Sequence, residues 1–239
     1  LVTGVQTCAL PICFNAGSAL GANGTAALAF LNTQVATAAG LAGWLLVERR
    51  RDGHATSLGA VSGAVAGLVA IPPACAFLAP WAAVVLGLIA GMLCALAVTI
   101  KYRLGFDDSL DVVGVHLVGG IWGTLSIGIF GTTQMTAWGA DGLLYGGGLT
   151  LLAKQALGVA VVLVYSGVLT YALGWLLDKS MGFRIPRDAE VEGIDLAMHA
   201  ETAYELDTRS GGGIAGLLRS EEHTSELQSL AYLVCRLLL

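Results

Sequence analysis

The chain has 239 residues, of which 56% are hydrophobic and only 12% are charged, and its mean hydropathy is +0.76. Soluble domains carry about 25% charged residues, so this composition excludes an ordinary soluble domain and predicts an all-α polytopic membrane protein. The net charge of −5 at pH 7 comes with no basic patch that would bind nucleic acid. The five cysteines have neither metal nor disulfide spacing, and we expect no metal, no cofactor and no enzymatic activity.

The two ends of the chain differ in character from the rest. Residues 2–12 (VTGVQTCALPI) and 219–229 (RSEEHTSELQS) resemble translations of the two strands of a common sequencing-adapter oligonucleotide. We therefore expect residues 1–13 and 219–239 to be adapter-derived and to carry no function. On this expectation the native segment covers residues 14–218, starts within a gene, and belongs to a protein that extends further upstream.

Five apolar stretches predict five complete transmembrane helices, and a sixth segment before them is typical of the end of a further helix. The stretches are Thr25–Val47, Ser57–Ala79, Trp81–Ile100, Val112–Phe130 and Leu143–Leu177, and the preceding segment is Phe14–Ala22. A membrane span needs about 20 apolar residues, so the last stretch must tilt strongly or leave the bilayer. Pro72 and Pro73 should stop or kink the second helix. Glycines spaced four residues apart in the second and third stretches predict close helix packing.

The loops between these stretches alternate in charge. Two of them carry Lys or Arg residues and two carry none; the former are 48–56 and 101–108, and the latter are 72–80 and 131–142. Loops rich in Lys and Arg stay in the cytoplasm, so both charged loops and the tail after Leu177 are expected there. On this topology Val112–Phe130 runs from inside to outside, and Phe14–Ala22 lies at the outer face.

His116 is the first candidate for a functional residue. It lies inside the run Val112–Phe130, which contains no charged residue, and glycines surround it at positions 114, 119, 120 and 123. An ionisable side chain within the membrane is energetically costly and usually serves a function. The small neighbours would allow other helices, or a narrow lumen, to approach the imidazole closely. A histidine that only hydrogen-bonds to a neighbouring helix is the simple alternative, and the membrane setting favours the functional interpretation.

Three stretches resemble the ammonium transporter family (Amt/Mep/Rh), and its Amt branch in particular. They are FNAGSA at 14–19, DDSLDVVGVHLVGGIWGT at 107–124 and GFRIPRDAEVEGIDLAMHAETAYE at 182–205. The resemblance implies eleven helices, with two groups of five forming an inverted repeat around a narrow pore, and a homotrimer. This chain resembles the second half, with a transmembrane domain at 14–180 and a cytoplasmic regulatory tail at 181–218.

The resemblance also implies roles for individual residues. His116 matches the second of the paired pore histidines, Phe14 one of two phenylalanines that gate the outer mouth, and Ser18 the serine that helps to recruit the cation. Aromatic faces and hydroxyl oxygens suit a cation, although ordinary packing of Phe14 and a bond from Ser18 to its own helix are alternatives. Asp108 matches a buried aspartate at the start of the pore helix, where we expect a structural cap rather than a cation ligand.

The function implied by the resemblance is transport of ammonium or ammonia across the cell membrane. The tail, with the C-terminus in the cytoplasm, would be docked by a P-II-type regulatory protein. One alternative is an ammonium sensor of the same fold. Another is an integral-membrane prenyltransferase, because residues 107–111 fit the DDxxD motif that binds magnesium diphosphate, although such enzymes need a second aspartate-rich motif.

Overall fold

The computed structural model describes residues 13–182, 184–194 and 198. The chain divides into two compact units, 1–161 and 162–239. Regular structure in the described residues is helical throughout, without a strand. Four helices are long and apolar enough to cross a membrane, namely Gly24–Asp52, Pro80–Leu104, Val112–Phe130 and Thr150–Ser180. The prediction of an all-α membrane protein is therefore confirmed.

Helix α2 (Gly24–Asp52) is longer than predicted, because the charged residues after Val47 continue the helix instead of forming a loop. Asn23 caps its start, since the Asn23 side chain accepts a hydrogen bond of 2.9 Å from the backbone N–H of Ala26. Three arginines, at positions 49 to 51, lie in its last turn, where cations offset the negative end of the helix dipole. The first charged loop is thus only four residues long, from Gly53 to Thr56.

Helix α3 (Ser57–Ala70) is nine residues shorter than the predicted span to Ala79. Pro72 and Pro73 lack the N–H groups that would continue the helix, and residues 71–78 form a series of turns. The fully buried Asn32 of α2 stabilises these turns, because its Nδ2 atom donates to the carbonyls of Cys75 and Leu78, each at 2.8 Å. The stop at the two prolines was predicted, and the shortness of the helix was not.

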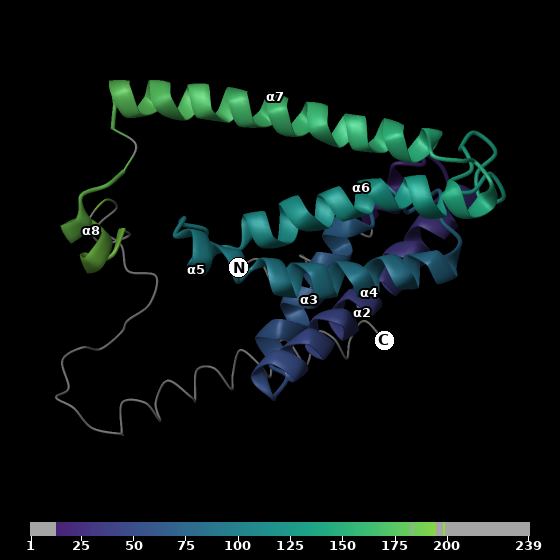
Figure 1. Ribbon diagram of the computed structural model, residues 1–239, viewed down its shortest axis with the longest axis horizontal. Coiled ribbons are helices and arrows are strands. Elements are labelled where there is room, and N and C mark those ends of the chain that lie inside the picture. Colours follow the sequence, from purple (N-terminus) through teal and green to yellow (C-terminus); the bar gives the residue numbers. More distant parts are fainter. Residues whose placement is uncertain (1–12, 183, 195–197, 199–239) are drawn as a thin grey trace. The chain divides into compact units, whose positions relative to one another are not determined.

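The remaining elements follow in order along the chain (Figure 1). They are α4 (Pro80–Ala97), α5 (Ile100–Leu104), the π-helix η1 (Val112–Leu117), α6 (Val118–Phe130), the 3₁₀ turn η2 (Leu143–Tyr145), α7 (Thr150–Ser180) and α8 (Arg187–Glu192). The predicted 35-residue span from Leu143 is therefore wrong at its start. Gly146 and Gly148 have φ angles of +83° and +66°, a conformation that glycine adopts without strain, and α7 begins only after them.

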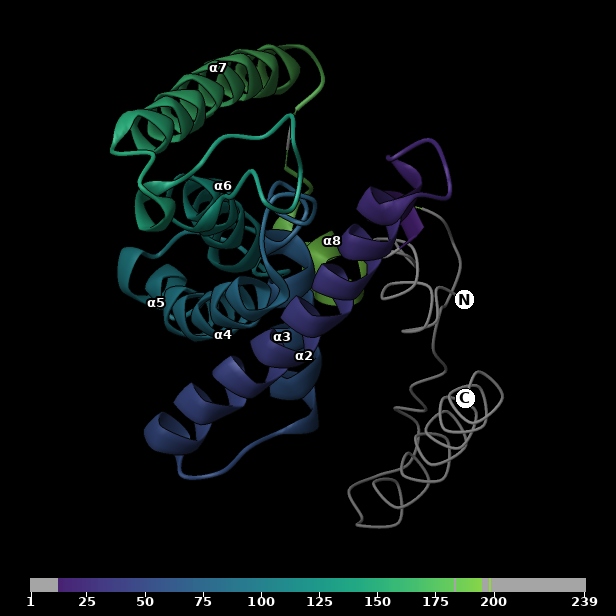
Figure 2. The ribbon, with the colours of Figure 1, turned by 90° about the vertical axis from the view of Figure 1, so that its right-hand side faces the viewer.

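Helix α2 packs against both α3 and α4, and α3 also contacts α4, so these three helices lie side by side in Figures 1 and 2. Glycines mediate both contacts, as their spacing predicted. A Cβ atom at Gly40 would lie 2.6 Å from the carbonyl oxygen of Gly63, and the α4 glycines Gly87 and Gly91 face the carbonyls of Ala36 and Gly40. Small residues let helix backbones approach closely where lipid offers no hydrophobic driving force. The backbones of these three helices are therefore in direct contact.

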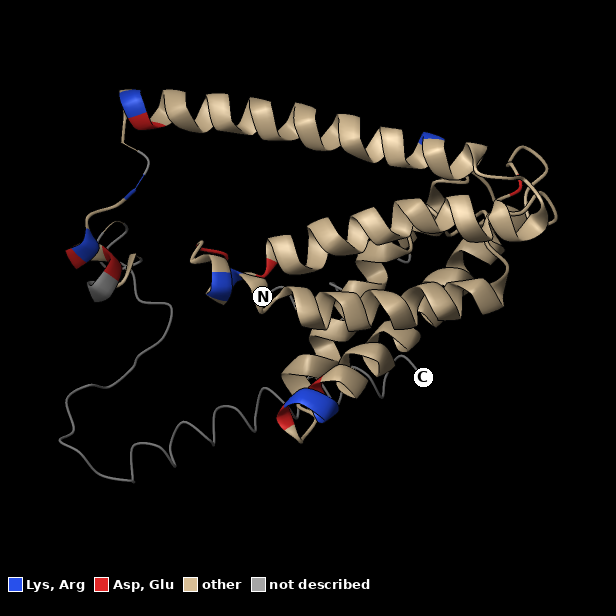
Figure 3. Cartoon of the chain, viewed as in Figure 1, with Lys and Arg blue, Asp and Glu red and all other residues tan. Residues whose placement is uncertain are grey.

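The loops lie at two opposite ends of the bundle according to their charge. At one end, the guanidinium of Arg51 donates a 3.0 Å hydrogen bond to the carbonyl of Ala95, near the last residue of α4. At the other end, the backbone N–H of Thr132 donates a 3.0 Å hydrogen bond to the carbonyl of Phe77. The two charged loops thus share one end and the two uncharged loops share the other, as the charge pattern predicted. Figure 3 shows that Lys, Arg, Asp and Glu are sparse along the helices between these ends.

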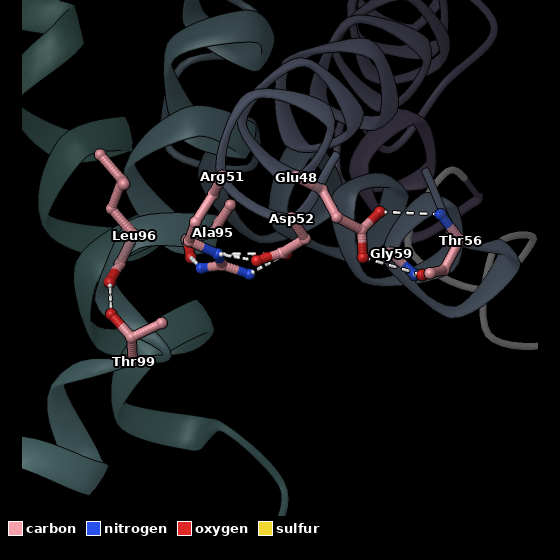
Figure 4. A network of polar contacts seen from close by, with 8 residues as sticks. All are labelled: Glu48, Arg51, Asp52, Thr56, Gly59, Ala95, Leu96 and Thr99. Carbon is pink, nitrogen blue, oxygen red and sulfur yellow. Dashed lines mark hydrogen bonds and ion pairs between the residues drawn. The ribbon is translucent and has the colours of Figure 1, made fainter. Parts of the chain in front are cut away.

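A polar network holds the helices together at the charged end (Figure 4). The Glu48 carboxylate, which is 8% exposed, accepts hydrogen bonds of 2.9 Å and 2.8 Å from the backbone N–H and the hydroxyl of Thr56. The Thr56 hydroxyl in turn accepts from the backbone N–H of Gly59 and caps α3. A carboxylate at a helix N-terminus is stabilised by the dipole, so Glu48 joins the end of α2 to the start of α3.

Candidate functional site

The segment that carries His116 begins as a π-helix and continues as an α-helix. The backbone N–H of Val118 reaches back to the carbonyl of Val113, five residues earlier, and also to that of Val115. The Val115 carbonyl accepts a further contact from the Cys94 thiol of α4, at 3.6 Å. Single π turns inside α-helices often occur at functional sites. This turn shifts the following residues around the helix axis by about 100° relative to an uninterrupted α-helix.

One face of η1 and α6 packs against the bundle through glycines. A Cβ atom at Gly114 would lie 2.8 Å from Val98, the residue that follows α4, and Gly123 faces the carbonyl of Ala70 at the end of α3. His116 lies on the other face, where it is exposed together with Val112, Val113 and Leu117. The imidazole therefore stands among apolar side chains on a face that residues 13–161 leave uncovered.

The start of this helix is held by two acidic residues and a lysine. The Asp108 carboxylate accepts hydrogen bonds from the backbone N–H groups of Val112 and Val113, at 2.8 Å and 2.9 Å. Asp111 adopts a left-handed conformation with φ +55°. The Lys101 ammonium of α5 donates to the Asp111 carboxylate at 2.7 Å and to the Asp108 carbonyl at 2.8 Å. Sequence reasoning missed Lys101, because its partners follow seven and ten residues later across an irregular loop.

Phe14 and Ser18 lie in a short helical segment, 13–17, and the turn that follows it. Phe14 is 73% exposed, and the Ser18 hydroxyl donates a 2.8 Å hydrogen bond to the Phe14 carbonyl. This is the bond within its own helix considered above, and it leaves the lone pairs of the hydroxyl available as acceptors. The buried Asn15 between them donates a 3.1 Å hydrogen bond to the Thr33 hydroxyl of α2. That contact places the segment near the uncharged end of the bundle.

The structure does not bring these candidates into one cluster. Phe14 and Ser18 lie at the uncharged end, whereas His116 lies little more than one turn from the start of a helix that begins at the charged end. Within the described residues no hydrogen bond joins His116 to Phe14 or Ser18.

The three aspartates of the DDxxD stretch each have a separate partner. Asp107 accepts a hydrogen bond from Ser109, Asp108 from the helix start, and Asp111 from Lys101. Among the described residues there is no group of three or more His, Cys, Asp or Glu side chains that could hold a metal ion. This arrangement does not favour the prenyltransferase alternative, which requires carboxylates that converge on magnesium.

Fold and site together define a multi-pass helical membrane protein with a histidine on an uncovered apolar face. The chain belongs to the ammonium transporter family, since that family's model matches residues 12–204. It is similar to an ammonium transporter of Mycobacterium tuberculosis, with 50% identity over 220 residues that cover 90% of this chain and 46% of the relative. The chain thus spans about half the length of the relatives it matches.

Solved structures agree with the family assignment. The crystal structure of Saccharomyces cerevisiae Mep2 has 30% sequence identity and a TM-score of 0.68, and the match covers 76% of this chain and 44% of that one. A structure described as a sensor Amt protein has 29% identity and a TM-score of 0.73, and the match covers 82% of this chain and 47% of that one. The predicted channel fold of this family is therefore confirmed.

Proposed function

We propose that this chain is the second half of an ammonium transporter that moves ammonium or ammonia across the cell membrane. The observation that carries the proposal is His116, an ionisable side chain on the uncovered apolar face of a membrane helix, in a chain of the ammonium transporter family. The first half of an eleven-helix inverted repeat would cover this face and complete a narrow pore. A homotrimer with one pore in each subunit is part of the same proposal.

The proposed chemistry follows from the cost of carrying a small cation through hydrocarbon. A bare ammonium ion cannot cross an apolar pore without compensation, so it is either coordinated throughout or deprotonated. At the outer mouth, the exposed ring of Phe14 would attract the cation through its π face, and Ser18 would offer a hydroxyl oxygen. Deeper in the pore, a neutral imidazole both donates and accepts a hydrogen bond. His116 would therefore guide ammonia or relay its proton, together with a second histidine from the first half.

The test of this role is His116→Ala in the full-length protein. We expect loss of ammonium-driven current, or of discrimination against potassium, with an unchanged amount of folded protein in the membrane. An Ala variant with the current and selectivity of the unmodified protein would refute the role of His116. Lys154→Met is a suitable control, because Lys154 is a second ionisable side chain in a membrane helix, α7, and has no part in the proposed pore.

We propose further that Asp108 caps the pore helix and does not bind the cation. Its two hydrogen bonds to backbone N–H groups support this role. The C-terminal tail would lie in the cytoplasm and be docked by a P-II-type regulatory protein, in line with the charge pattern and with the family resemblance of residues 182–205. Most of that tail, 199–218, lies outside the described residues. P-II binding that is unchanged after deletion of 181–218 would contradict the docking proposal.

The proposed adapter-derived segments also lie outside the described residues, apart from Cys13. Sequencing of the native locus beyond both ends tests this assignment directly. We expect the segments 1–13 and 219–239 to be replaced by other sequence, with five more helices and a second membrane histidine upstream. If both segments prove genomic, the chain would need a separately encoded partner to form a pore.

A sensor of the same fold is the second candidate, and the similarity to the sensor Amt structure is the observation that favours it. A sensor would carry a signalling domain beyond the tail, which the same sequencing experiment would detect. A transporter would instead restore growth of a transporter-deficient host on low ammonium.

A further inference from the structure

We propose that Lys101 is a positioning residue for His116, and this proposal rests on the pore role of His116 proposed above. Lys101 lies in α5, which sits beside the start of η1 and α6 (Figure 1). Its ammonium group joins α5 to both residues that determine how the pore helix begins, Asp108 and Asp111.

The helix that carries His116 has a strained start. Asp111 is a non-glycine residue with φ +55° and ψ +33°, and it immediately precedes the π turn. This left-handed conformation costs free energy for any residue with a Cβ atom, although Asp tolerates it better than most. Such a conformation persists only where surrounding contacts hold it. The salt bridge to Lys101, at 2.7 Å, is the side-chain contact that holds Asp111 in this conformation.

The side chains of the two aspartates bind different groups at the start of the helix. The Asp108 side chain is occupied by the backbone N–H groups of Val112 and Val113, so it fixes the first turn of the helix. The Asp108 carbonyl is bound by Lys101 and also accepts the backbone N–H of Asp111, at 3.2 Å. Lys101 therefore contacts both the turn that caps the helix and the residue that starts it.

The Lys101 side chain is largely shielded from solvent. Only 15% of the Lys101 side chain is exposed, against 37% for Asp111. Fully exposed ion pairs contribute little to structure, because water and side-chain entropy compete with them. A partly buried ammonium with two oxygen partners constrains geometry more strongly. Its Nζ atom also lies 5.3 Å from the centre of the Tyr102 ring.

These contacts at the helix start affect the direction in which the His116 imidazole points. His116 follows Asp111 by five residues and lies inside the π turn, so its position around the helix axis depends on where that turn begins. If the turn relaxed to regular α-helix, the residues on its two sides would rotate relative to each other by about 100°. The imidazole, which lies within the turn, would then change direction relative to the face of α6 that packs against Ala70 through Gly123. Lys101 thus acts through Asp111 on the direction in which His116 points.

The test compares three variants of the full-length protein in a host without its own ammonium transporters. Lys101→Met removes the charge, Lys101→Arg keeps it, and Arg103→Met is the matched control. Arg103 lies in the same short helix, is exposed, and forms no ion pair with any described residue. The readouts are the transport rate per folded molecule and the ratio of ammonium to methylammonium transport, because this ratio is independent of the amount of protein.

We expect Lys101→Met to lower the rate per folded molecule by about ten- to a hundredfold, as a displacement of about 1 Å at a reacting group does. The ratio of ammonium to methylammonium transport should change in the same direction as in His116→Ala. Lys101→Arg should restore most of the rate, and Arg103→Met should stay within roughly twofold. An unchanged rate and ratio in Lys101→Met, or a loss that Arg103→Met shares, would overturn the proposal.

Two further variants keep the outcome decisive. If Lys101→Met fails to fold, Asp111→Asn removes the ion pair but keeps an oxygen acceptor, and it should give a smaller loss with the same change in ratio. Transport by Asp111→Asn at the unmodified rate and ratio would then overturn the proposal. His116→Ala separates the two hypotheses. If it transports normally, the pore role of His116 fails, whereas a loss in His116→Ala without one in Lys101→Met refutes only the role of Lys101.

Discussion

Replacing Gly40 by alanine should separate α2 from α3 and destabilise the protein. A Cβ atom at this position would lie 2.6 Å from the carbonyl oxygen of Gly63, 2.8 Å from the nitrogen of Gly67 and 2.9 Å from its Cα atom. Favourable contacts begin at about 3.5 Å, so relief of the shortest contact requires the helices to move apart by roughly 0.9 Å. All three contacted atoms belong to the backbone of α3, and no side-chain rotation can relieve the clash.

The expected magnitude is the balance of two effects. Overpacking of a close interface costs about 1–3 kcal/mol, and the better helix propensity of alanine returns about 1 kcal/mol. The net loss in the free energy of unfolding should therefore lie between about 0 and 2 kcal/mol, and it should be near the upper limit because all three clashes are with backbone atoms. In a protein of this size or larger, that lowers the midpoint of thermal unfolding by a few degrees.

The assay is the fraction of detergent-solubilised full-length protein that stays folded after heating, followed by size-exclusion chromatography. Gly24→Ala is the matched control, because Gly24 lies at the start of the same helix and an added Cβ atom there meets nothing within 4 Å. The control should be as stable as the unmodified protein or slightly more so. A midpoint for Gly40→Ala equal to that of Gly24→Ala would refute the packing argument.

Three further predictions concern loops and helix ends. Asn32→Leu leaves the buried carbonyls of Cys75 and Leu78 without their donor, which should cost about 1–3 kcal/mol for each of them and appear as a lower thermal midpoint. Thr56→Val removes both hydrogen bonds of the Thr56 hydroxyl, the one to Glu48 and the one from Gly59 that caps α3. This change should lower the free energy of unfolding by about 1–2 kcal/mol, whereas Thr56→Ser, which keeps the hydroxyl, should not. The Thr133 backbone N–H, at 2.8 Å, holds the pKa of the Asp141 carboxyl below its ordinary value. A lowered pKa stabilises the fold above the pKa of the unfolded chain and loses that contribution as pH falls through the folded value. The unmodified protein should thus be more stable than Asp141→Asn at pH 7 but not at pH 2, and an equal difference at both pH values would contradict this.

Much of the fold could be predicted from the sequence because the membrane imposes a simple rule on helix length and charge. The apolar runs predicted the positions of the helices, and the distribution of Lys and Arg predicted the end of the bundle at which each loop lies. The errors occurred where local backbone chemistry overrides hydropathy. Residues 71–79 are apolar enough for a helix, but two prolines and the Asn32 side chain hold them in turns. The apolar residues from Leu143 likewise precede three glycines that delay the start of α7.

The candidate site could be predicted only in part. A lone histidine in an apolar run is conspicuous, and the structure places His116 on an exposed face of its helix. The sequence showed no sign of the π turn, and the two residues that pair at the start of this helix, Lys101 and Asp111, are ten positions apart. A lysine at the end of a span is normally assigned to the membrane surface. Sequence alone therefore gave no reason to connect Lys101 to a residue on another helix.

The glycine contacts of α2 limit how this half of the protein can move. The Ala36 carbonyl is flanked by Gly67 on one side and by Gly87 on the other, so sliding α2 along either neighbour would drive backbone against backbone. Many transporters work by rocking one helix bundle against another. The three helices would therefore keep their mutual positions, and a motion of this kind would carry α2, α3 and α4 together as one group.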